Sequence, residues 1–236
     1  MLPGHRGLAG FSGEGDPYFP NVILLIHGND GVVGTSSIVD RAPAPVPLNV
    51  VGNPRYDGSR GVFGGSSLYF DGTGDNLNSD DATAWDFGTG DFTIEFAFYN
   101  NEPDNNRGII DMRSGTSGTG PCIDNQTSGS GGLRFRINNN IFYTDTRTWT
   151  GSWHWVAMTR TGGQVRCYID GGLAYTYANS TSLTGNRMTI GSYIDQRGTG
   201  NFYHWKGWLN EIRVTRGVAR YAGASYALPT APFPNS

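Results

Sequence analysis

Residues 61–75 read GVFGGSSLYFDGTGD and form the clearest strand-and-turn unit of the chain. A glycine turn leads into a short strand at 68–70, which stops at an Asp-Gly turn. Ten residues further on, residues 85–96 read WDFGTGDFTIEF. This glycine turn opens a longer strand at 92–99, whose apolar residues recur at period two and therefore share one face. Both units predict antiparallel β structure with tight turns.

The same pattern continues along the rest of the chain. Alternating prolines at 41–47 exclude a central strand there, because proline cannot donate to the ladder. The Gly/Ser/Thr-rich residues 114–132 read as a loop that is interrupted by Cys122 and Ile123. No helix-period stretch exceeds a turn or two, so the sequence predicts an all-β fold with two packed antiparallel sheets, a β-sandwich. The predicted strands are 22–26, 68–70, 92–99, 133–137, 141–143, 153–160, 164–169, 173–177, 188–193 and 208–215.

Composition narrows the class of protein. The 236 residues include 36 Gly and one Lys, and the formal net charge is −3, which favours neither nucleic acid nor an anionic membrane as a partner. No apolar run approaches the roughly 20 residues of a membrane span. The first residues lack the hydrophobic core of a signal peptide, so we expect synthesis in a cytosol without export by that route.

The chain is expected to divide into an arm and one domain. Residues 1–17 are rich in Gly and Pro and carry no apolar period, so they read as an extended arm or linker, with a loose end as the alternative. Residues 18–236 are expected to form the sandwich. Cys122 and Cys167 could close a bridge, but two free thiols are the better reading for a protein kept in a reducing compartment. Cys167 lies between Val165 and Ile169 on one strand face and behaves there as a small hydrophobe.

Five motifs in order resemble a known family. Besides 61–75 and 85–96, these are WHWVAMTR at 153–160, RCYIDG at 166–171 and NEIRVTRGVARY at 210–221. Together they resemble the laminin G-like, concanavalin A-like lectin/glucanase family, in the version common in bacteriophage tail, fibre and other virion proteins. Trp155 stands where the family usually has His. The resemblance implies a concanavalin A-like jelly roll over most of the chain.

The resemblance also implies a function. We expect a non-catalytic virion module of tail-fibre, receptor-binding or head-decoration type, which binds a host-surface glycan or another virion protein. A purely structural virion subunit without sugar binding is the alternative, and a glycoside hydrolase of the same fold is the least favoured. The expected location is the virion, after synthesis in the host cytoplasm. The expected partners are other virion proteins and host carbohydrate, without nucleic acid or membrane insertion, and assembly with copies of itself is an open alternative.

Candidate catalytic groups do not form a recognisable pattern. A hydrolase of this fold needs two carboxylates facing one cleft, hence acids at alternate positions of a strand. The four Glu, at positions 14, 95, 102 and 211, show no such spacing. No Gly-x-Ser-x-Gly elbow is present, and His154 reads as a strand residue in a Trp-rich hairpin. We therefore expect no enzyme activity and no required cofactor.

A structural calcium ion is the metal that the resemblance implies. The family places such an ion between the end of the first strand, the Asp-Gly turn and an acid of the last strand. The matching positions here are Asn29, Gly72 and Asn210. Asn210 replaces the family's Asp, and the loss of a carboxylate weakens an all-oxygen site.

Two polar loops are candidates for a glycan-binding rim, since loops on a rigid sandwich often carry function. One spans 195–204 and supplies Asp195, Arg197, Tyr203 and His204 as candidate ligand-binding residues. The other spans 100–107. Aromatic faces beside amide or carboxylate groups suit sugars. The alternative is that the aromatic residues pack inward and the rest is solvated turn.

Overall fold

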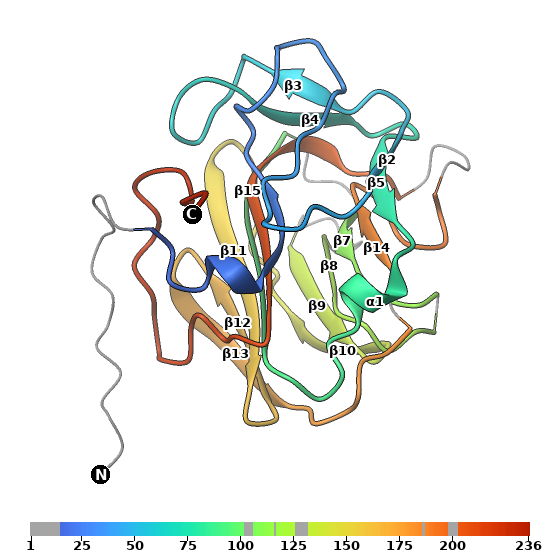
Figure 1. The fold of residues 1–236 in the computed structure, drawn as a ribbon, viewed down its shortest axis with the longest axis vertical. Coiled ribbons are helices and arrows are strands. Elements are labelled where there is room, and N and C mark those ends of the chain that lie inside the picture. The colour runs from blue at the N-terminus through green and yellow to red at the C-terminus, as the bar shows by residue number, and fades with distance from the viewer. Residues whose placement is uncertain (1–14, 102–105, 116, 126–131, 186, 198–202) are drawn as a thin grey trace.

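The computed structural model describes residues 15–101, 106–115, 117–125, 132–185, 187–197 and 203–236. Two antiparallel sheets pack face to face (Figure 1), which confirms the predicted sandwich. None of the helices in these residues has the length and hydrophobicity to cross a membrane. They are one short 3-10 turn, η1 (Phe19–Asn21), and one turn of α-helix, α1 (Ala82–Trp85).

The first sheet has the long strands in its centre. β15 pairs with β6 on one side and with both β4 and β1 on the other, so that it lies at the middle of the sheet. In sheet order, the strands are β13 (Gly172–Ala178), β12 (Gln164–Ile169), β11 (Trp153–Thr161), β6 (Phe92–Asn100), β15 (Lys206–Arg216), β4 (Ser67–Asp71) and β3 (Arg55–Asp57), with β1 (Val22–Ile26) added to β15.

The second sheet is built of shorter strands, and the sequence predicted only part of it. β8 lies inside the stretch 114–132 that was expected to be a loop, so that expectation is wrong there. The strand reads Cys-Ile-Asp-Asn, and its polar residues are held by partners on the neighbouring strands rather than by an apolar pattern. In sheet order, the strands are β10 (Asn140–Thr144), β9 (Leu133–Ile137), β8 (Cys122–Asn125), β7 (Gly108–Asp111), β14 (Met188–Ile190), β5 (Asn76–Ser79) and β2 (Asn49–Val51).

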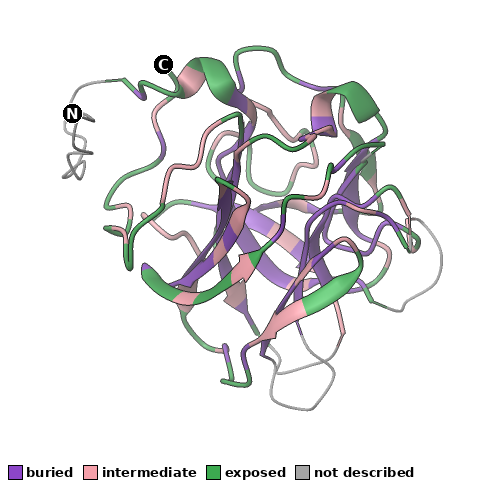
Figure 2. Cartoon of the chain, turned by 90° about the horizontal axis from the view of Figure 1, so that it is seen from below, coloured by how far each residue is buried: buried purple, intermediate pink, exposed green. Residues whose placement is uncertain are grey.

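The core lies between the sheets, where buried strand segments face each other (Figure 2). As the period-two pattern predicts, Phe92, Ile94, Phe96 and Phe98 of β6 all belong to this one cluster. Cys167 belongs to it too. Cys122 lies in the other sheet, and both cysteines are free and buried, which agrees with the preferred reading of the two thiols.

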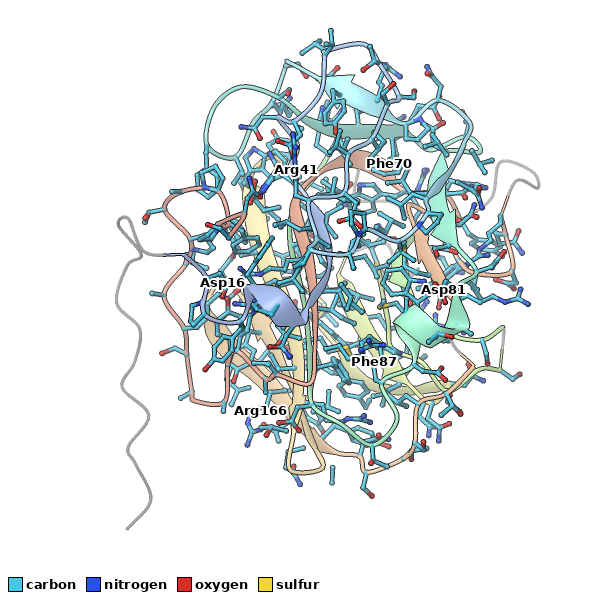
Figure 3. All side chains as sticks on the ribbon, in the orientation of Figure 1. Asp16, Arg41, Phe70, Asp81, Phe87 and Arg166 are labelled. Atoms are coloured by element: carbon cyan, nitrogen blue, oxygen red, sulfur yellow. The ribbon has the colours of Figure 1, made fainter. Side chains whose placement is uncertain are left out.

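The outer face of the first sheet is covered by the two ends of the described chain. Asp16 is buried there, next to η1 (Figure 3), and its backbone N–H donates to the carbonyl of Ser236 at 2.6 Å. Its carboxylate pairs with Arg213 at 3.1 Å and with Arg220 at 2.6 Å. The expected boundary after residue 17 is therefore wrong at Asp16, which is part of the sandwich; residues 1–14 lie outside the described chain.

A bulge divides β15 and fixes the C-terminal segment. The register shifts between Asn210 and Arg213, and Glu211 has a φ of 48°, in the left-handed region. The bulge turns the Glu211 carboxylate toward His27, whose Nδ1 lies 2.9 Å away, and toward the Phe233 N–H, which donates to it at 2.7 Å. Bulges re-aim side chains in this way.

The His27–Glu211 pair makes stability depend on pH. Burial by itself lowers the pKa of His27, but the hydrogen bond and charge of Glu211 raise it more, so the pKa lies above the ordinary 6.5. A raised histidine pKa stabilises the fold fully below about pH 6.5, and that contribution is lost as the pH rises through the folded value. We expect His27→Gln to cost more stability near pH 6 than near pH 9 in thermal unfolding. A cost that is independent of pH would show that the imidazole is neutral in the fold.

Candidate functional site

A polar pocket of about 290 Å³ opens on the outer face of the second sheet. Its floor follows from strand alternation, since Leu133, Phe135 and Ile137 of β9 point into the core while Arg134 and Arg136 point away from it. Eight residues line the pocket: Asn106, Arg113, Arg136, Asn139, Tyr193, Asp195, Gln196 and Tyr203.

Buried ion pairs hold the floor rigid. Arg113 grips Asp111 with two hydrogen bonds, from Nε at 2.9 Å and from Nη2 at 2.6 Å. On the next strands, Asp124 is paired with Arg134 at 2.6 Å and with Arg136 at 2.9 Å. Both aspartates are fully buried. A planar guanidinium held by a carboxylate in two places has a fixed orientation, so the pocket floor is preorganised.

Tyr193 stands between the arginines. Its ring lies 5.8 Å from the guanidinium carbon of Arg113 and 5.5 Å from that of Arg136. Its hydroxyl accepts a hydrogen bond from Arg134 Nη2 at 3.0 Å and donates to Asn106 Oδ1 at 3.0 Å. Burial, together with the negative charge of Asp124, raises the pKa of Tyr193, so its hydroxyl stays protonated.

The two loops singled out in the sequence meet at this pocket. Asn106 comes from one, and Asp195 and Tyr203 come from the other. Tyr203 is 41% exposed, and its ring centroid lies 5.8 Å from that of Tyr193, so the two rings form an aromatic wall. Residues 102–105 and 198–202 of these loops lie outside the described chain.

Two of the four candidate ligand-binding residues do not line the pocket. His204 is 0% exposed and packs inside the sandwich, with Nδ1 3.4 Å from the carbonyl of Asp75, so the expectation that it faces a ligand is wrong. Arg197 is held by Thr189 Oγ1 at 2.6 Å, by the carbonyl of Met188 at 2.7 Å and by the carboxylate of Asp80. Its guanidinium therefore fastens the loop to the sheet.

The three residues of the implied calcium site are not brought together. Asn29 adjoins Asn210, because the residue before Asn29 donates its backbone N–H to Asn210 Oδ1. Leu209 pairs with Leu68, which places Asn210 beside the start of β4, whereas Gly72 follows the end of that strand. The separation along β4 is roughly 16 Å, so Gly72 and Asn210 cannot bind one ion. The described residues also contain no cluster of three His, Cys, Asp or Glu side chains suited to a metal.

A hydrogen-bonded series of Ser152, His154 and Asp170, for which the sequence showed no motif, lies at the start of β11. Ser152 Oγ is 2.8 Å from His154 Nε2, and His154 Nδ1 is 2.8 Å from Asp170 Oδ2. Asp170 also accepts the N–H of Trp155, and Trp149 packs on the imidazole with ring centroids 4.6 Å apart. An acyl-transfer triad needs a substrate pocket beside the serine, and none of the three residues lines either pocket described here. We interpret these hydrogen bonds as structural contacts that hold the loop before β11 against the β12–β13 turn.

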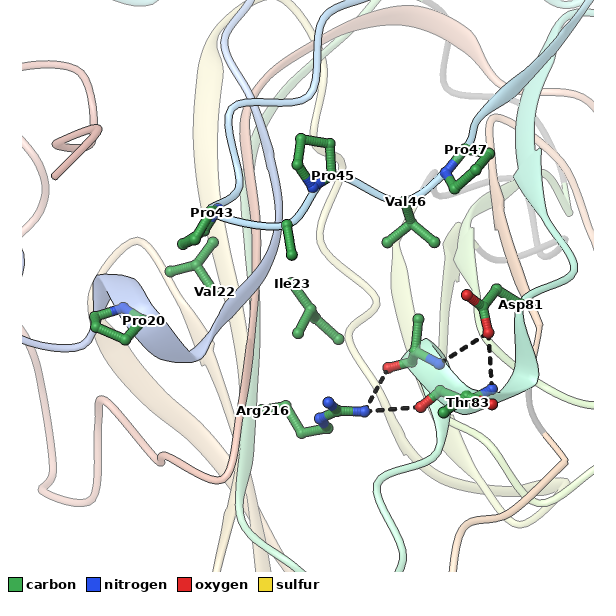
Figure 4. Close-up of a pocket in the computed structure, with 12 residues that line it drawn as sticks. Pro20, Val22, Ile23, Pro43, Pro45, Val46, Pro47, Asp81, Thr83 and Arg216 are labelled. Carbon is green, nitrogen blue, oxygen red and sulfur yellow. Dashed lines mark hydrogen bonds between the residues drawn. The ribbon is translucent and has the colours of Figure 1, made fainter.

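A second pocket, of about 330 Å³, lies between the proline-rich segment and α1 (Figure 4). Pro43, Pro45 and Pro47 line one side. The charged groups on the other side form structural hydrogen bonds with α1. Asp81 caps the helix by accepting from the N–H groups of Thr83 and Ala84. Arg216 donates to carbonyls of the same helix. With its polar groups engaged, this pocket offers little to recognise a hydroxylated ligand.

The sequence contains one local signal for the pocket floor. Arg134 and Arg136 alternate with three core residues, which places two cations on one outer face. Asp111 and Arg113, which complete the floor, gave no comparable signal. They lie in and after a four-residue strand, and their proximity to β9 depends on strand order.

Comparison with known proteins supports one family. Residues 71–219 match the family model described as the concanavalin A-like lectin/glucanases superfamily, over more than half of the chain. No curated protein sequence matches the chain significantly.

Several solved structures share the fold at low sequence identity. The botulinum neurotoxin serotype D binding domain matches with a TM-score of 0.60 and 13% identity, over 86% of this chain and 50% of that one. Domain 4 of AbnA, an extracellular arabinanase of Geobacillus stearothermophilus in complex with arabinotriose, matches with 0.57 and 14%, over 84% and 94%. The Trypanosoma rangeli sialidase matches with 0.60 and 13%, over 84% and 31%. The chain thus spans about half the length of the toxin binding domain it matches.

Proposed function

The chain belongs to the concanavalin A-like lectin/glucanase superfamily, and on that basis we propose that it is a non-catalytic carbohydrate-binding module of a bacteriophage virion. In this proposal the polar pocket holds a glycan of the host surface. The observation that carries it is the pocket itself, in which two tyrosine rings, three side-chain amides and two arginines converge on a preorganised sheet. This combination of apolar faces and fixed hydrogen-bonding groups is typical of sugar sites.

The placement of the acidic residues supports a binding role rather than catalysis. Glycoside hydrolysis uses two carboxylates on either side of the bond to be cleaved. Within the described chain, Asp195 is the one carboxylate that lines the pocket. Asp111 and Asp124 are buried beneath arginines, and Glu95 and Glu211 are buried on the outer side of the other sheet. The proposal therefore includes no turnover of polysaccharide.

The virion setting rests on the sequence motifs, which resemble those of phage tail and fibre proteins. The fold likeness adds a relative described with bound arabinotriose and toxin binding domains, one of them described in complex with SialylT. A structural virion subunit, bound to other virion proteins or to copies of itself, is the alternative that the following test separates.

Tyr203→Ala should weaken glycan binding about tenfold or more, because it removes one wall of the pocket. The melting temperature should hardly move, since substitutions at exposed sites usually change stability by about 0.5 kcal/mol or less. Binding is measured on a glycan array and then by calorimetry with the best glycan.

Tyr175→Ala is the matched control, since Tyr175 is also about half exposed, at 43%, but lies on β13 of the other sheet. Its loss should leave glycan binding unchanged. If wild-type protein binds no glycan on the array, the structural-subunit alternative replaces the proposed function. Reducing ends released from a host polysaccharide by purified protein would contradict the non-catalytic part.

A further inference from the structure

The charges beneath the polar pocket do not balance. Arg113 and Asp111 pair one to one through two hydrogen bonds. Asp124, by contrast, is shared by two guanidinium groups, those of Arg134 and Arg136. Three cations thus face two buried carboxylates, so the buried groups carry one surplus positive charge. The third carboxylate of the pocket, that of Asp195, is exposed on the rim and acts on Arg113. A positive charge without a buried counter-charge at a largely desolvated site favours binding of an anion there.

The surplus charge faces the pocket at Arg136. Arg134 is committed elsewhere, because its Nη2 donates to Asn106 Oδ1 at 2.7 Å and to the Tyr193 hydroxyl at 3.0 Å. Arg136 lines the pocket. Its Nε is buried and lies 2.9 Å from Asp124 Oδ2, but without the alignment of a hydrogen bond. Apart from this contact and the face of Tyr193, the described residues give the Arg136 guanidinium no partner.

The groups around Arg136 define the kind of anion that fits. A carboxylate matches the two parallel N–H groups of a guanidinium in shape and charge. The side-chain amides of Asn106, Asn139 and Gln196 line the same pocket, and they suit hydroxyl groups. The Asp195 carboxylate on the rim would repel an anionic ligand. Because Asp195 is exposed, solvent and salt screen this repulsion.

We propose that the polar pocket selects an acidic sugar residue, whose carboxylate pairs with the Arg136 guanidinium while its hydroxyl groups bind the surrounding amides. This inference rests on the proposed function and specifies its ligand class. It makes Arg136 a specificity-determining residue, because a neutral sugar leaves the surplus charge uncompensated.

The titration of Asp124 supplies an independent signature. Burial raises the pKa of Asp124 to about 6, although Arg134 and Arg136 act to lower it. The other ionisable groups near Asp124 are Asp111 on β7, Cys122 on β8 itself and Tyr193 beyond β14. As the pH falls below about 6, Asp124 becomes neutral and the surplus charge grows, while a sugar carboxylate with a pKa of roughly 3.5 stays ionised. Affinity for an acidic sugar should therefore rise between about pH 7.5 and pH 5.5.

The test uses two probes that differ in one group, methyl β-glucuronide and methyl β-glucoside, titrated into the full chain and followed by calorimetry or NMR. N-acetylneuraminic acid is a second acidic probe. We expect the glucuronide to bind about tenfold or more tightly than the glucoside, as befits a charge-assisted pair. Arg136→Gln should abolish this preference, because it weakens binding of the glucuronide much more than binding of the glucoside. Arg136→Lys, which keeps the charge but not the planar fork, should retain part of it. Arg166→Gln, on β12 of the other sheet, should retain all of it.

The outcomes separate the two proposals. Equal binding of both probes, or a preference that survives in Arg136→Gln, overturns the acidic-sugar inference and leaves the proposed function standing. An affinity for the glucuronide that does not rise as the pH is lowered also counts against it. If neither probe, N-acetylneuraminic acid nor any glycan of an array binds to folded wild-type protein, both proposals fail.

Discussion

Replacing Asp16 by asparagine is expected to lower the free energy of unfolding by about 3 kcal/mol, because it leaves a buried charge network unbalanced. Asp16 and Glu95 together neutralise Arg213 and Arg220 under the chain ends, with distances of 2.6 to 3.1 Å for the close pairs. Without the Asp16 charge, two buried guanidinium groups share one carboxylate. A loss of this size corresponds to roughly 6–12 °C in melting temperature for a chain of this length.

The effect should also depend on pH in a defined direction. Burial would raise the pKa of Asp16, but the hydrogen bond and charge of Arg220, followed by the Tyr18 N–H and Arg213, outweigh it and hold the pKa below 3.8. Its stabilising contribution is present above that value and is lost as the pH falls through the folded pKa. The gap between wild type and Asp16→Asn should therefore narrow below about pH 4.

Asp30→Asn is the matched control for Asp16. Asp30 also pairs with an arginine, Arg41, at 3.0 Å, but the Arg41 side chain is 45% exposed. An ion pair of this kind contributes about 1 kcal/mol or less. Equal losses for the two variants would show that the buried network does not fasten the N-terminal segment to the sheet.

Replacing Arg160 by methionine is expected to cost about 3 kcal/mol, because a buried guanidinium then no longer binds three backbone carbonyls. Arg160 Nε and Nη2 donate to Gly90, Nη2 also donates to Gly88 at 2.7 Å, and Nη1 donates to Thr181 at 3.0 Å. These bonds tie the loop before β6 and the segment after β13 to the end of β11. Chemical denaturation of both proteins measures the loss.

Arg187→Met is the control for Arg160, since Arg187 is exposed and its nearest carboxylate, that of Asp80, lies 3.7 Å away. It should change the free energy of unfolding by about 0.5 kcal/mol or less. A small effect at both positions would mean that water replaces the Arg160 donors at the three carbonyls without cost.

The sequence alone determined the sandwich and most of the first sheet. Long strands such as β6 bury one face in the core, so their apolar residues recur at period two and can be recognised locally. The turn residues between strands, such as Gly162 and Gly163 with φ of 56° and 72°, are also local signals. The loops that supply Asn106, Asp195 and Tyr203 to the pocket were recognised for the same reason, because clusters of polar turn residues mark them.

Tertiary structure decided the rest, because it depends on pairs of residues far apart in the chain. β8 is stabilised by salt bridges between Asp124 and the arginines of β9. No periodic pattern in the sequence of β8 predicts these pairs. Asp16 lies in a segment whose sequence is typical of a linker. It becomes part of the fold through its ion pairs with Arg213 of β15 and with Arg220, which follows β15. His204 and Tyr203 are adjacent in the sequence and both carry an aromatic ring with a hydrogen-bonding group, yet His204 is buried and Tyr203 is exposed. The surplus charge at Arg136 likewise exists only because strand order brings two arginines to one buried carboxylate, a long-range electrostatic arrangement that local sequence patterns do not encode.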